Sequence, residues 1–386
     1  MASFANPSST TSSLQKSLAK RDLVLVNIAA PDVPVTDHKV ALLGSGSYGS
    51  AYSVKARDGR FLAVKTINAA KWMDELNATK RQIKAEINSW VALAEHPNIV
   101  KYCFEWGWPQ GDHLYIAMQY CSGGDLHAKI QTDTSSEVAK WMLQLARGVE
   151  WMHKKKVVHR DLYTKNVFLD DQNNVRIGDF GLARSTATAH ATQSAAQTLQ
   201  QGRGYRPFWS PERMKNLTKH QASYPDDMWC VGMIALELLN GVEIESLVGW
   251  SSIAVATPQN QSKLQTLKTN AKTKQNDLYV QIEGLFEEDP TQRTTAEQLA
   301  QRLHLLINNT SPQFKNRLTS FEEVGYKSPL TGWDTRDFVT LDEATRGLSI
   351  ASISSRKYFL INKYIIFLMV FLHSSPFFFL TFSVFH

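Results

Sequence analysis

A glycine-rich segment between two predicted strands constrains the fold of this chain more than any other feature. The strands are indicated by apolar alternation at residues 40–43 and 51–54, on either side of the glycines. The segment itself consists of Gly44, Ser45, Gly46, Ser47, Tyr48 and Gly49. Glycine lets a backbone close over a phosphate chain without a Cβ clash, whereas a dinucleotide-binding fold needs a helix directly after the last glycine. Because a strand follows instead, the sequence predicts a hairpin loop, and its assignment to phosphate binding depends on the residues that follow.

A lysine and a glutamate follow this loop at positions where they can help to bind the phosphates of a nucleotide. Ala63, Val64 and Lys65 lie on the next predicted strand, residues 61–67, and Glu86 lies in a predicted helix over residues 72–93. A cation below the loop can hold the α- and β-phosphates, and a carboxylate from the helix can hold that cation in place. Lys65 taken by itself could equally be a surface lysine on an edge strand.

A second cluster supplies the groups that phosphoryl transfer needs. His159, Arg160 and Asp161 are followed by Asn166, and Asp179 opens an Asp-Phe-Gly sequence thirteen positions further on. A hydroxyl nucleophile needs a carboxylate to orient it and accept its proton, while Asn and Asp supply oxygen ligands for a Mg²⁺ ion that bridges phosphates. Each residue alone could simply cap a helix or satisfy a turn. In this order they indicate a site with Asp161 as the base and Asn166 and Asp179 as metal ligands.

Taken together, these segments resemble the signature set of the eukaryotic protein kinases over about 270 of the 386 residues. The set extends to Ser210-Pro211-Glu212 and to a late motif whose Arg293 would pair with Glu212 in a structural ion pair. The resemblance implies an α+β, bilobal protein-kinase fold with a small β-rich N-lobe and a larger helical C-lobe. It also implies ATP and Mg²⁺ as cofactors and proteins as substrates.

The resemblance assigns further residues to the nucleotide and to the core. It implies an adenine-binding hinge from Gln119 to Cys121, with Asp125 near the ribose, and it places Ala63 among the nucleotide-binding residues. It also implies an internal stack of four side chains that links the lobes. These are Trp90, Tyr102, His159 and Phe180.

Two positions depart together from the pattern of serine/threonine kinases. Tyr163 stands where those kinases carry a lysine, two residues after the catalytic Asp, and Tyr205 stands where they carry the threonine that bonds to this lysine. Lys165, four residues after Asp161, is the candidate for the work of the absent lysine, and tyrosine kinases carry their basic residue at that position.

We expect transfer to Ser or Thr hydroxyls, because Gly123-Gly124-Asp125-Leu126 looks like the serine/threonine branch. A tyrosine or dual-specificity kinase is one alternative. A pseudokinase or scaffold that binds ATP without turnover is a second, and a small-molecule kinase of similar fold is a third.

The remaining sequence divides around a kinase domain over residues 37–308. Residues 1–36, rich in Ser and Thr near the start, are expected to form a flexible arm, and residues 309–356 a linker or tail. The net charge of +6 is small and its charges are scattered, so no nucleic-acid partner is required. Three cysteines without metal-ligand or disulfide spacing favour a cytoplasmic or nuclear location. The oligomeric state is left open.

The last segment, residues 357–386, is dominated by Phe, Leu, Ile and Tyr. Its two apolar runs, residues 364–372 and 377–385, are each shorter than the roughly 20 residues that span a bilayer. Joined, they could form a poor C-terminal anchor, which would make the protein membrane-associated. The second interpretation is a gene-model artefact, because these residues have AT-rich codons and the composition changes abruptly near Arg356.

Overall fold

The computed structural model describes most of the chain between residues 14 and 310. The described residues are 14–27, 29–34, 37–46, 49–68, 83, 87–107, 113–132, 135–180, 184–185, 204–215, 223–249, 251–254 and 257–310. The predictions made for Ser47, Tyr48 and Glu86 lie outside these residues. So do those for residues 311–386, which include the whole of a second unit, residues 342–386.

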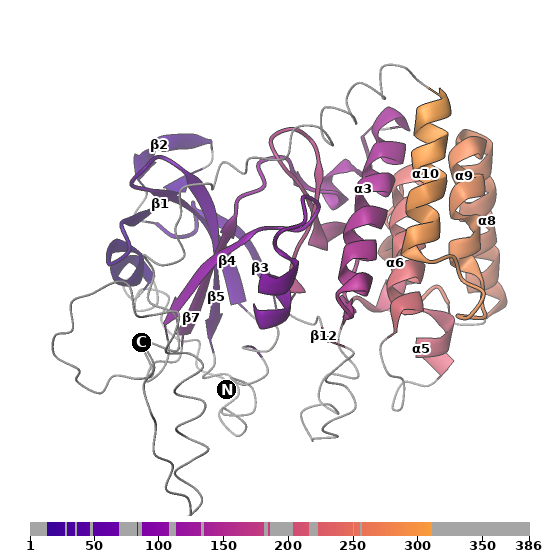
Figure 1. Cartoon of the computed structure of the whole chain (residues 1–386), viewed down its shortest axis with the longest axis horizontal. Coiled ribbons are helices and arrows are strands. Elements are labelled where there is room, and N and C mark those ends of the chain that lie inside the picture. Colours follow the sequence, from indigo (N-terminus) through magenta and orange to yellow (C-terminus); the bar gives the residue numbers. More distant parts are fainter. Residues whose placement is uncertain are drawn as a thin grey trace, which may run out of the picture. The chain divides into compact units, whose positions relative to one another are not determined.

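The N-lobe is a seven-stranded antiparallel sheet, drawn in indigo to purple in Figure 1. Its order is β2-β1-β4-β5-β7-β6, and β3 also pairs with β4. The strands are β1 Leu23–Asn27, β2 Ala30–Pro34, β3 Leu42–Gly46, β4 Gly49–Ala56, β5 Phe61–Asn68, β6 Tyr102–Gly107 and β7 His113–Gln119. The central strands β5 and β7 are rich in Val, Ile, Leu and aromatic residues and are buried on both faces, which is why they lie in the middle of the sheet.

The expectation of a flexible arm over residues 1–36 was wrong for its second half. Residues 14–19 are helical, and β1 pairs antiparallel with β4, with Leu25 opposite Val54. Leu14 and Leu18 are buried in one cluster with Leu25, and the Trp106 indole N–H donates to Ser17 Oγ at 2.8 Å. Two apolar patterns follow the Ser/Thr-rich start: the pair Leu14 and Leu18 at i and i+4, and the run Leu-Val-Leu-Val from residue 23. Residues of both pack into the cluster on the outer face of the sheet.

The C-lobe is mainly helical and is drawn from magenta to orange in Figure 1. Its helices are α3 Ser135–Lys154, α5 Pro211–Lys215, α6 Tyr224–Asn240, α7 Ile244–Val248, α8 Pro258–Lys274, α9 Asn276–Ile282 and α10 Ala296–Thr310. One apolar face of α3 is buried, and α6 is buried along almost its whole length. Helix α6 starts with a capping box between Ser223 and Asp226 and ends at Gly241 in the left-handed conformation.

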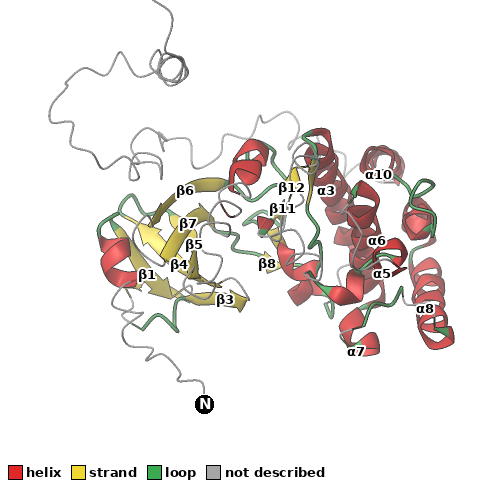
Figure 2. Cartoon of the chain, turned by 90° about the horizontal axis from the view of Figure 1, so that it is seen from below, coloured by secondary structure: helices red, strands yellow, loops and turns green. Residues whose placement is uncertain are grey.

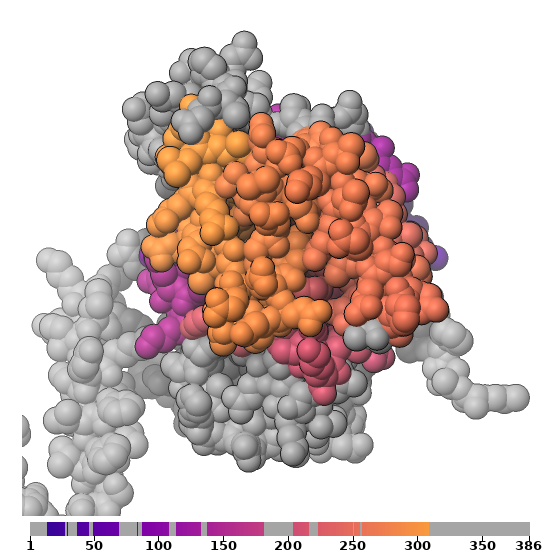
Figure 3. All heavy atoms as spheres, turned by 90° about the vertical axis from the view of Figure 1, so that its right-hand side faces the viewer, coloured from indigo at the N-terminus to yellow at the C-terminus, as the bar shows by residue number. Residues whose placement is uncertain are grey.

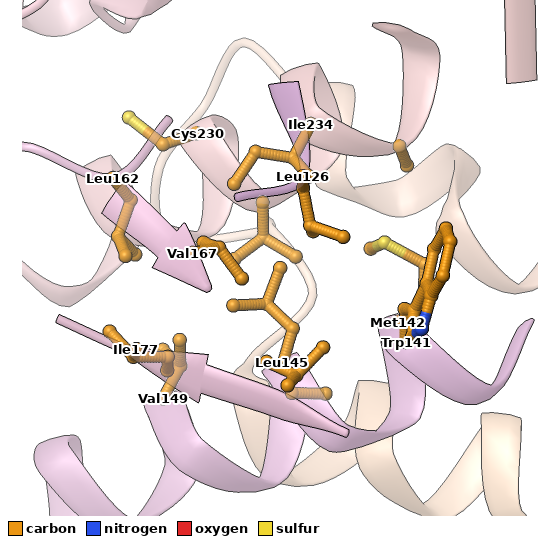
Figure 4. Packing of buried hydrophobic residues seen from close by; sticks show 14 of the residues in the cluster. Leu126, Trp141, Met142, Leu145, Val149, Leu162, Val167, Ile177, Cys230 and Ile234 are labelled. Atoms are coloured by element: carbon orange, nitrogen blue, oxygen red, sulfur yellow. The ribbon is translucent and has the colours of Figure 1, made fainter. Parts of the chain in front are cut away.

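The core of this lobe lies between α3, α6 and a small sheet. Figure 4 shows Met142, Leu145 and Val149 of α3 facing Val167 and Ile177 of that sheet. Helices α8, α9 and α10 form the outer face of the lobe, the orange surface in Figure 3. Among the described residues, no helix combines the length and the apolar composition that crossing a bilayer requires.

Short strands between the lobes position the loops that carry the predicted site. In the small sheet, β10 Val167–Leu169 pairs with β11 Val175–Ile177 and with β8 Gly124–Asp125. A separate pair joins β9 Val157–Val158 to β12 Arg184–Ser185. Figure 2 shows β8 and β11 between the N-lobe strands and the C-lobe helices. The predicted α+β fold, with a β-rich N-lobe and a helical C-lobe, is therefore confirmed.

Candidate active site

Asp161 lies in the loop between β9 and the 3₁₀ turn Thr164–Asn166, and both oxygens of its carboxylate are hydrogen-bonded. The Tyr205 backbone N–H donates to Oδ1 at 2.8 Å, and the Asn166 side-chain amide donates to Oδ2 at 3.2 Å. The same amide also donates to the Asp161 carbonyl at 2.8 Å. Burial, and then the negative charge of Asp179, raise the pKa of Asp161. The arrangement fixes the direction in which this carboxylate can accept a proton.

The loop that carries Asp161 is anchored to helix α6 by a buried carboxylate. Asp227, 1% exposed, accepts the backbone N–H groups of His159 at 2.9 Å and Arg160 at 3.0 Å. His153 Nε2 lies 3.0 Å from the same carboxylate. Asp227 was not among the predicted site residues. An acidic residue near the start of an otherwise apolar helix was the signal that could have found it.

Lys65 of the N-lobe forms an ion pair with Asp179, which lies in the loop after β11. Lys65 lies on β5 with a largely buried side chain, and its Nζ is 2.6 Å from Asp179 Oδ1, across 114 residues of sequence. Asp179 follows β11 and has a φ of +53°, which turns its carboxylate out of the strand direction. The predicted partner of Lys65, Glu86, lies outside the described residues. The contact with Asp179 was not predicted, and it places the predicted phosphate-binding cation beside a predicted metal ligand.

The residues at Asn166 and Asp179 fit a Mg²⁺ ion. The Asn166 amide nitrogen is engaged with Asp161, so its amide oxygen is the atom left for a metal. Asp179 adds a carboxylate, and its charge is close enough to raise the pKa of Asp161. Mg²⁺ prefers oxygen ligands and in such sites takes one or two protein ligands together with substrate phosphates. Among the described residues, no group of three His, Cys, Asp or Glu side chains could hold a metal by itself.

The predicted nucleotide residues lie on the β3–β4 hairpin, on the central strands β5 and β7, and on the segment that follows β7. Gly46 and Gly49 pair across the β3–β4 hairpin, and a Cβ on Gly49 would lie 1.6 Å from the Thr66 carbonyl oxygen, so only glycine fits there. Ala63 lies opposite Met118, one residue before the hinge. Burial raises the pKa of the Cys121 thiol to about 12, so the hinge cysteine stays neutral.

Ser45 and Asp125 also have local hydrogen bonds. The hydroxyls of Ser45 and Ser50 are 2.9 Å apart across the hairpin, and Asp125 accepts the Ala128 N–H at 3.0 Å. Gln119 ends β7, and its backbone N–H donates to the Lys101 carbonyl at 2.9 Å. Asp125 therefore caps a turn, and a ribose contact would be an additional role for its second oxygen.

The four side chains of the predicted internal stack contact one another in the order Tyr102, Trp90, Phe180 and His159. The Trp90 ring centroid lies 5.7 Å from that of Tyr102 and 5.6 Å from that of Phe180. Phe180 in turn lies 5.1 Å from His159, whose Nε2 is 2.9 Å from the Gly178 carbonyl oxygen. The stack connects the N-lobe sheet to the loop of Asp161.

The predicted pair between Glu212 and Arg293 is confirmed. Two guanidinium nitrogens of Arg293 donate to the two carboxylate oxygens of Glu212, at 2.6 and 2.9 Å. The Arg293 side chain is completely buried, and it also donates to the carbonyl groups of Pro225 and Glu287. This bidentate pair ties α5 to the last helices and has a structural role.

The two tyrosines that depart from the kinase pattern lie against each other. The ring centroids of Tyr163 and Tyr205 are 4.4 Å apart, with 19° between the ring planes. Lys165 is exposed on the turn Thr164–Asn166. Its proposed role in place of the absent lysine stays a prediction.

Comparisons with known proteins agree with this geometry. The family model described as "Protein kinase domain" matches residues 38–305. The chain is 35% identical over 222 residues to serine/threonine-protein kinase Nek4 of Mus musculus, covering 54% of this chain and 26% of that protein. It is 30% identical over 288 residues to serine/threonine-protein kinase dst1 of Dictyostelium discoideum, covering 73% and 36% respectively.

A third relative is serine/threonine-protein kinase Nek2 of Homo sapiens, 35% identical over 209 residues, which cover 51% of this chain and 44% of that protein. The chain thus spans less than half the length of each of these curated relatives. The match of the family model over more than half of the chain, together with the arrangement of Lys65, Asp161, Asn166 and Asp179, shows the family. This chain belongs to the protein kinase family, on the side of its serine/threonine members.

Proposed function

We propose that this chain transfers the γ-phosphate of ATP to Ser or Thr hydroxyls of protein substrates. The observation that carries the proposal is the convergence of Lys65, Asp161, Asn166 and Asp179, which come from one strand and two loops, into one site. A pseudokinase would be expected to lack at least one of these groups. The relatives' names support serine/threonine specificity, because all three are serine/threonine-protein kinases.

In this proposal each side chain has one task. Lys65 holds the phosphates, and Asp161 orients the acceptor hydroxyl and accepts its proton. Asn166 and Asp179 would hold Mg²⁺, which when bound offsets the negative charge of the phosphates. The hairpin of β3 and β4 covers the phosphates, and the hinge from Gln119 to Cys121 receives the adenine. The proposed location is cytoplasmic or nuclear, unless residues 357–386 prove to be an anchor.

Phosphosite mapping tests the proposal directly. The purified full chain is incubated with ATP, Mg²⁺ and a generic protein substrate such as casein, and the modified residues are identified by mass spectrometry. Phosphoserine and phosphothreonine are expected, and chelation of the metal with EDTA should abolish both. Phosphotyrosine would assign the chain to the tyrosine or dual-specificity class, and ATP binding without any phosphosite would make it a pseudokinase.

A further inference from the structure

Tyr205 packs against two aromatic rings, next to the proposed catalytic carboxylate. One face stacks on Tyr163, with centroids 4.4 Å apart. Phe208, which is completely buried, contacts the ring edge-on with a centroid distance of 5.2 Å. Aromatic pairs in these two geometries add stability beyond the area that they bury. The ring of Tyr205 therefore has one well-defined place beside the loop of Asp161.

Two hydrogen bonds of Tyr205 connect the proposed base, Asp161, to helix α7. The Tyr205 backbone N–H donates to Asp161 Oδ1 at 2.8 Å, and the Tyr205 hydroxyl donates to Glu245 Oε2 at 2.9 Å. The residue before it, Gly204, has a φ of +109°, and a Cβ there would lie 3.0 Å from the Arg160 carbonyl oxygen. The chain can approach the catalytic loop this closely only with glycine at that position.

The electrostatics of the pair limit what it can do. Burial, and then the hydrogen bond to Glu245, raise the pKa of Tyr205. Burial, followed by the charges of Asp161 and Asp179, raises the pKa of Tyr163. Both phenols are therefore neutral at physiological pH. A neutral pair cannot supply a positive charge to the phosphoryl group, but it can orient its neighbours.

We infer that Tyr205 and Glu245 are positioning residues for Asp161, and that the stack with Tyr163 replaces, by packing, the lysine–threonine pair of serine/threonine kinases. The carboxylate of Glu245 fixes the phenol, the phenol fixes the backbone at residue 205, and the backbone N–H fixes Asp161. The inference rests on the proposed kinase activity, because Asp161 is the base of that reaction. It adds a link between α7 and Asp161, and the binding of ATP does not depend on this link.

A double-mutant cycle on turnover tests the link. Tyr205→Phe removes the hydroxyl and keeps the stack, and Glu245→Ala removes its acceptor. Each should lower kcat about 3- to 10-fold, the effect of one hydrogen bond, with the KM for ATP unchanged. The double variant should lose no more than either single variant, because the two changes break the same bond. Glu245→Gln, whose amide oxygen can still accept, should restore most of the activity.

The matched control is Glu243→Ala, which removes a carboxylate two residues away that faces His127, 3.3 Å distant, instead of Tyr205. It should leave kcat unchanged. Additive losses in the double variant, or a loss in Glu243→Ala as large as in Glu245→Ala, would overturn the inference. A simple loss of folding is distinguished by the rescue in Glu245→Gln.

Amide hydrogen exchange tests the link without relying on turnover. In the wild-type chain the Tyr205 N–H should be protected by Asp161, and Tyr205→Phe and Glu245→Ala should each speed its exchange by about tenfold or more. Glu243→Ala and Glu245→Gln should match the wild type. If the chain shows no turnover, the proposed activity fails while this measurement still decides the link. If exchange is unaltered in both variants, the link is wrong even in an active kinase.

Discussion

At the scale of single residues, the site depends on how Asp161 is held. One oxygen accepts a backbone N–H from a segment 44 positions away in sequence, and the other accepts the amide of Asn166. A carboxylate with both oxygens fixed presents its remaining lone pairs in set directions, which suits a proton acceptor. Lys65 is instead proposed to bind the phosphates directly, and Asn166 and Asp179 through Mg²⁺. Replacing Asp161 should therefore affect the chemical step and spare nucleotide binding.

Asp161→Asn should lower kcat by roughly 10²- to 10⁴-fold, the usual contribution of a positioned base. The affinity for Mg·ATP, measured by calorimetry, should stay within about twofold of the wild type, because the phosphate ligands are intact. Asp171→Asn, an exposed carboxylate in the turn between β10 and β11, is the control and should be silent. Near-normal turnover in Asp161→Asn would falsify the assignment of the base.

Lys165→Ala should lower kcat by about 10²-fold, as expected when one charge is lost from the transition state. The reason is that Tyr163 and Tyr205 are neutral, and Lys165 is the basic side chain between Asp161 and Asn166. Steady-state kinetics with a peptide substrate would measure the loss. Unchanged kinetics would assign the charge to another cation, such as Arg206, whose guanidinium lies 5.3 Å from the centre of the Trp209 ring.

Glu237→Gln should flatten the pH dependence of stability. Glu237 is 1% exposed, accepts the Ile244 N–H and the Thr164 hydroxyl at 2.9 Å each, and has its pKa raised by burial from 4.5 to about 7. Between pH 4.5 and about 7 the folded chain holds a proton that the unfolded chain has released. The free energy of unfolding should therefore fall with rising pH, by at most about 1.4 kcal/mol per unit from this group.

Urea unfolding at several pH values in that window measures the effect of Glu237→Gln. Asp171→Asn, at an exposed carboxylate that is not among the groups acting on Glu237, is the control and should keep the wild-type slope. An equal slope in the wild type and in Glu237→Gln would show that Glu237 ionises normally in the folded chain.

At the scale of elements, the segment before the family match is part of the N-lobe. Strand β1 extends the sheet beside β4, and the helical residues 14–19 bury Leu14 and Leu18 against it. Trp106 on β6 is covered by this segment, as its hydrogen bond to Ser17 shows. The matched domain begins at residue 38, but the hydrophobic cluster on the outer face of the sheet begins at Leu14.

Leu18→Ala should lower the free energy of unfolding by about 2–5 kcal/mol, because it removes a side chain that is 1% exposed and leaves a cavity. Leu305→Ala, at a position 60% exposed on α10, is the matched control and should change stability by less than about 0.5 kcal/mol. Urea unfolding of both variants gives the comparison. Equal effects would mean that residues 14–19 do not contribute to the folded core.

At the scale of the whole molecule, the proposed catalytic residues and the described elements of both lobes all lie before residue 311. The residues assigned to the site, with the anchoring Asp227 and the positioning Glu245, all precede α8, and the last helix, α10, ends at Thr310. The apolar segment at residues 357–386 supplies none of them. The tail can therefore be tested separately from the catalytic domain.

A chain truncated after Ser355 should be soluble and should have the same kcat as the full chain. Turnover and sedimentation with membranes, each compared between the two forms, measure this. Transcript sequencing is expected to show a different end, in keeping with the gene-model interpretation. A transcript that includes residues 357–386, with the full chain pelleting with membranes and the truncated chain staying soluble, would instead establish the anchor.

Much of the site could be predicted because its functional residues are grouped in short segments of the sequence. The glycine hairpin, Lys65, the loop from His159 to Asn166 and Asp179 each occupy a few consecutive residues, and their order along the chain is informative by itself. The stack of Trp90, Tyr102, His159 and Phe180 also followed, but through the family resemblance. The N-terminal strand was missed because five apolar-rich residues are ambiguous until a partner strand is known.

The sequence by itself determined the family, the order of the elements and the identity of the reacting groups. Residue type and local spacing are sufficient for these, because a carboxylate, an amide or a glycine hairpin has its chemistry wherever it folds. The tertiary structure alone decided the pairing of Lys65 with Asp179 and the stacking of Tyr163 on Tyr205. These contacts join residues 114 and 42 positions apart, and no local periodicity specifies them. They arise only when the packing of both lobes brings the loops to the same place.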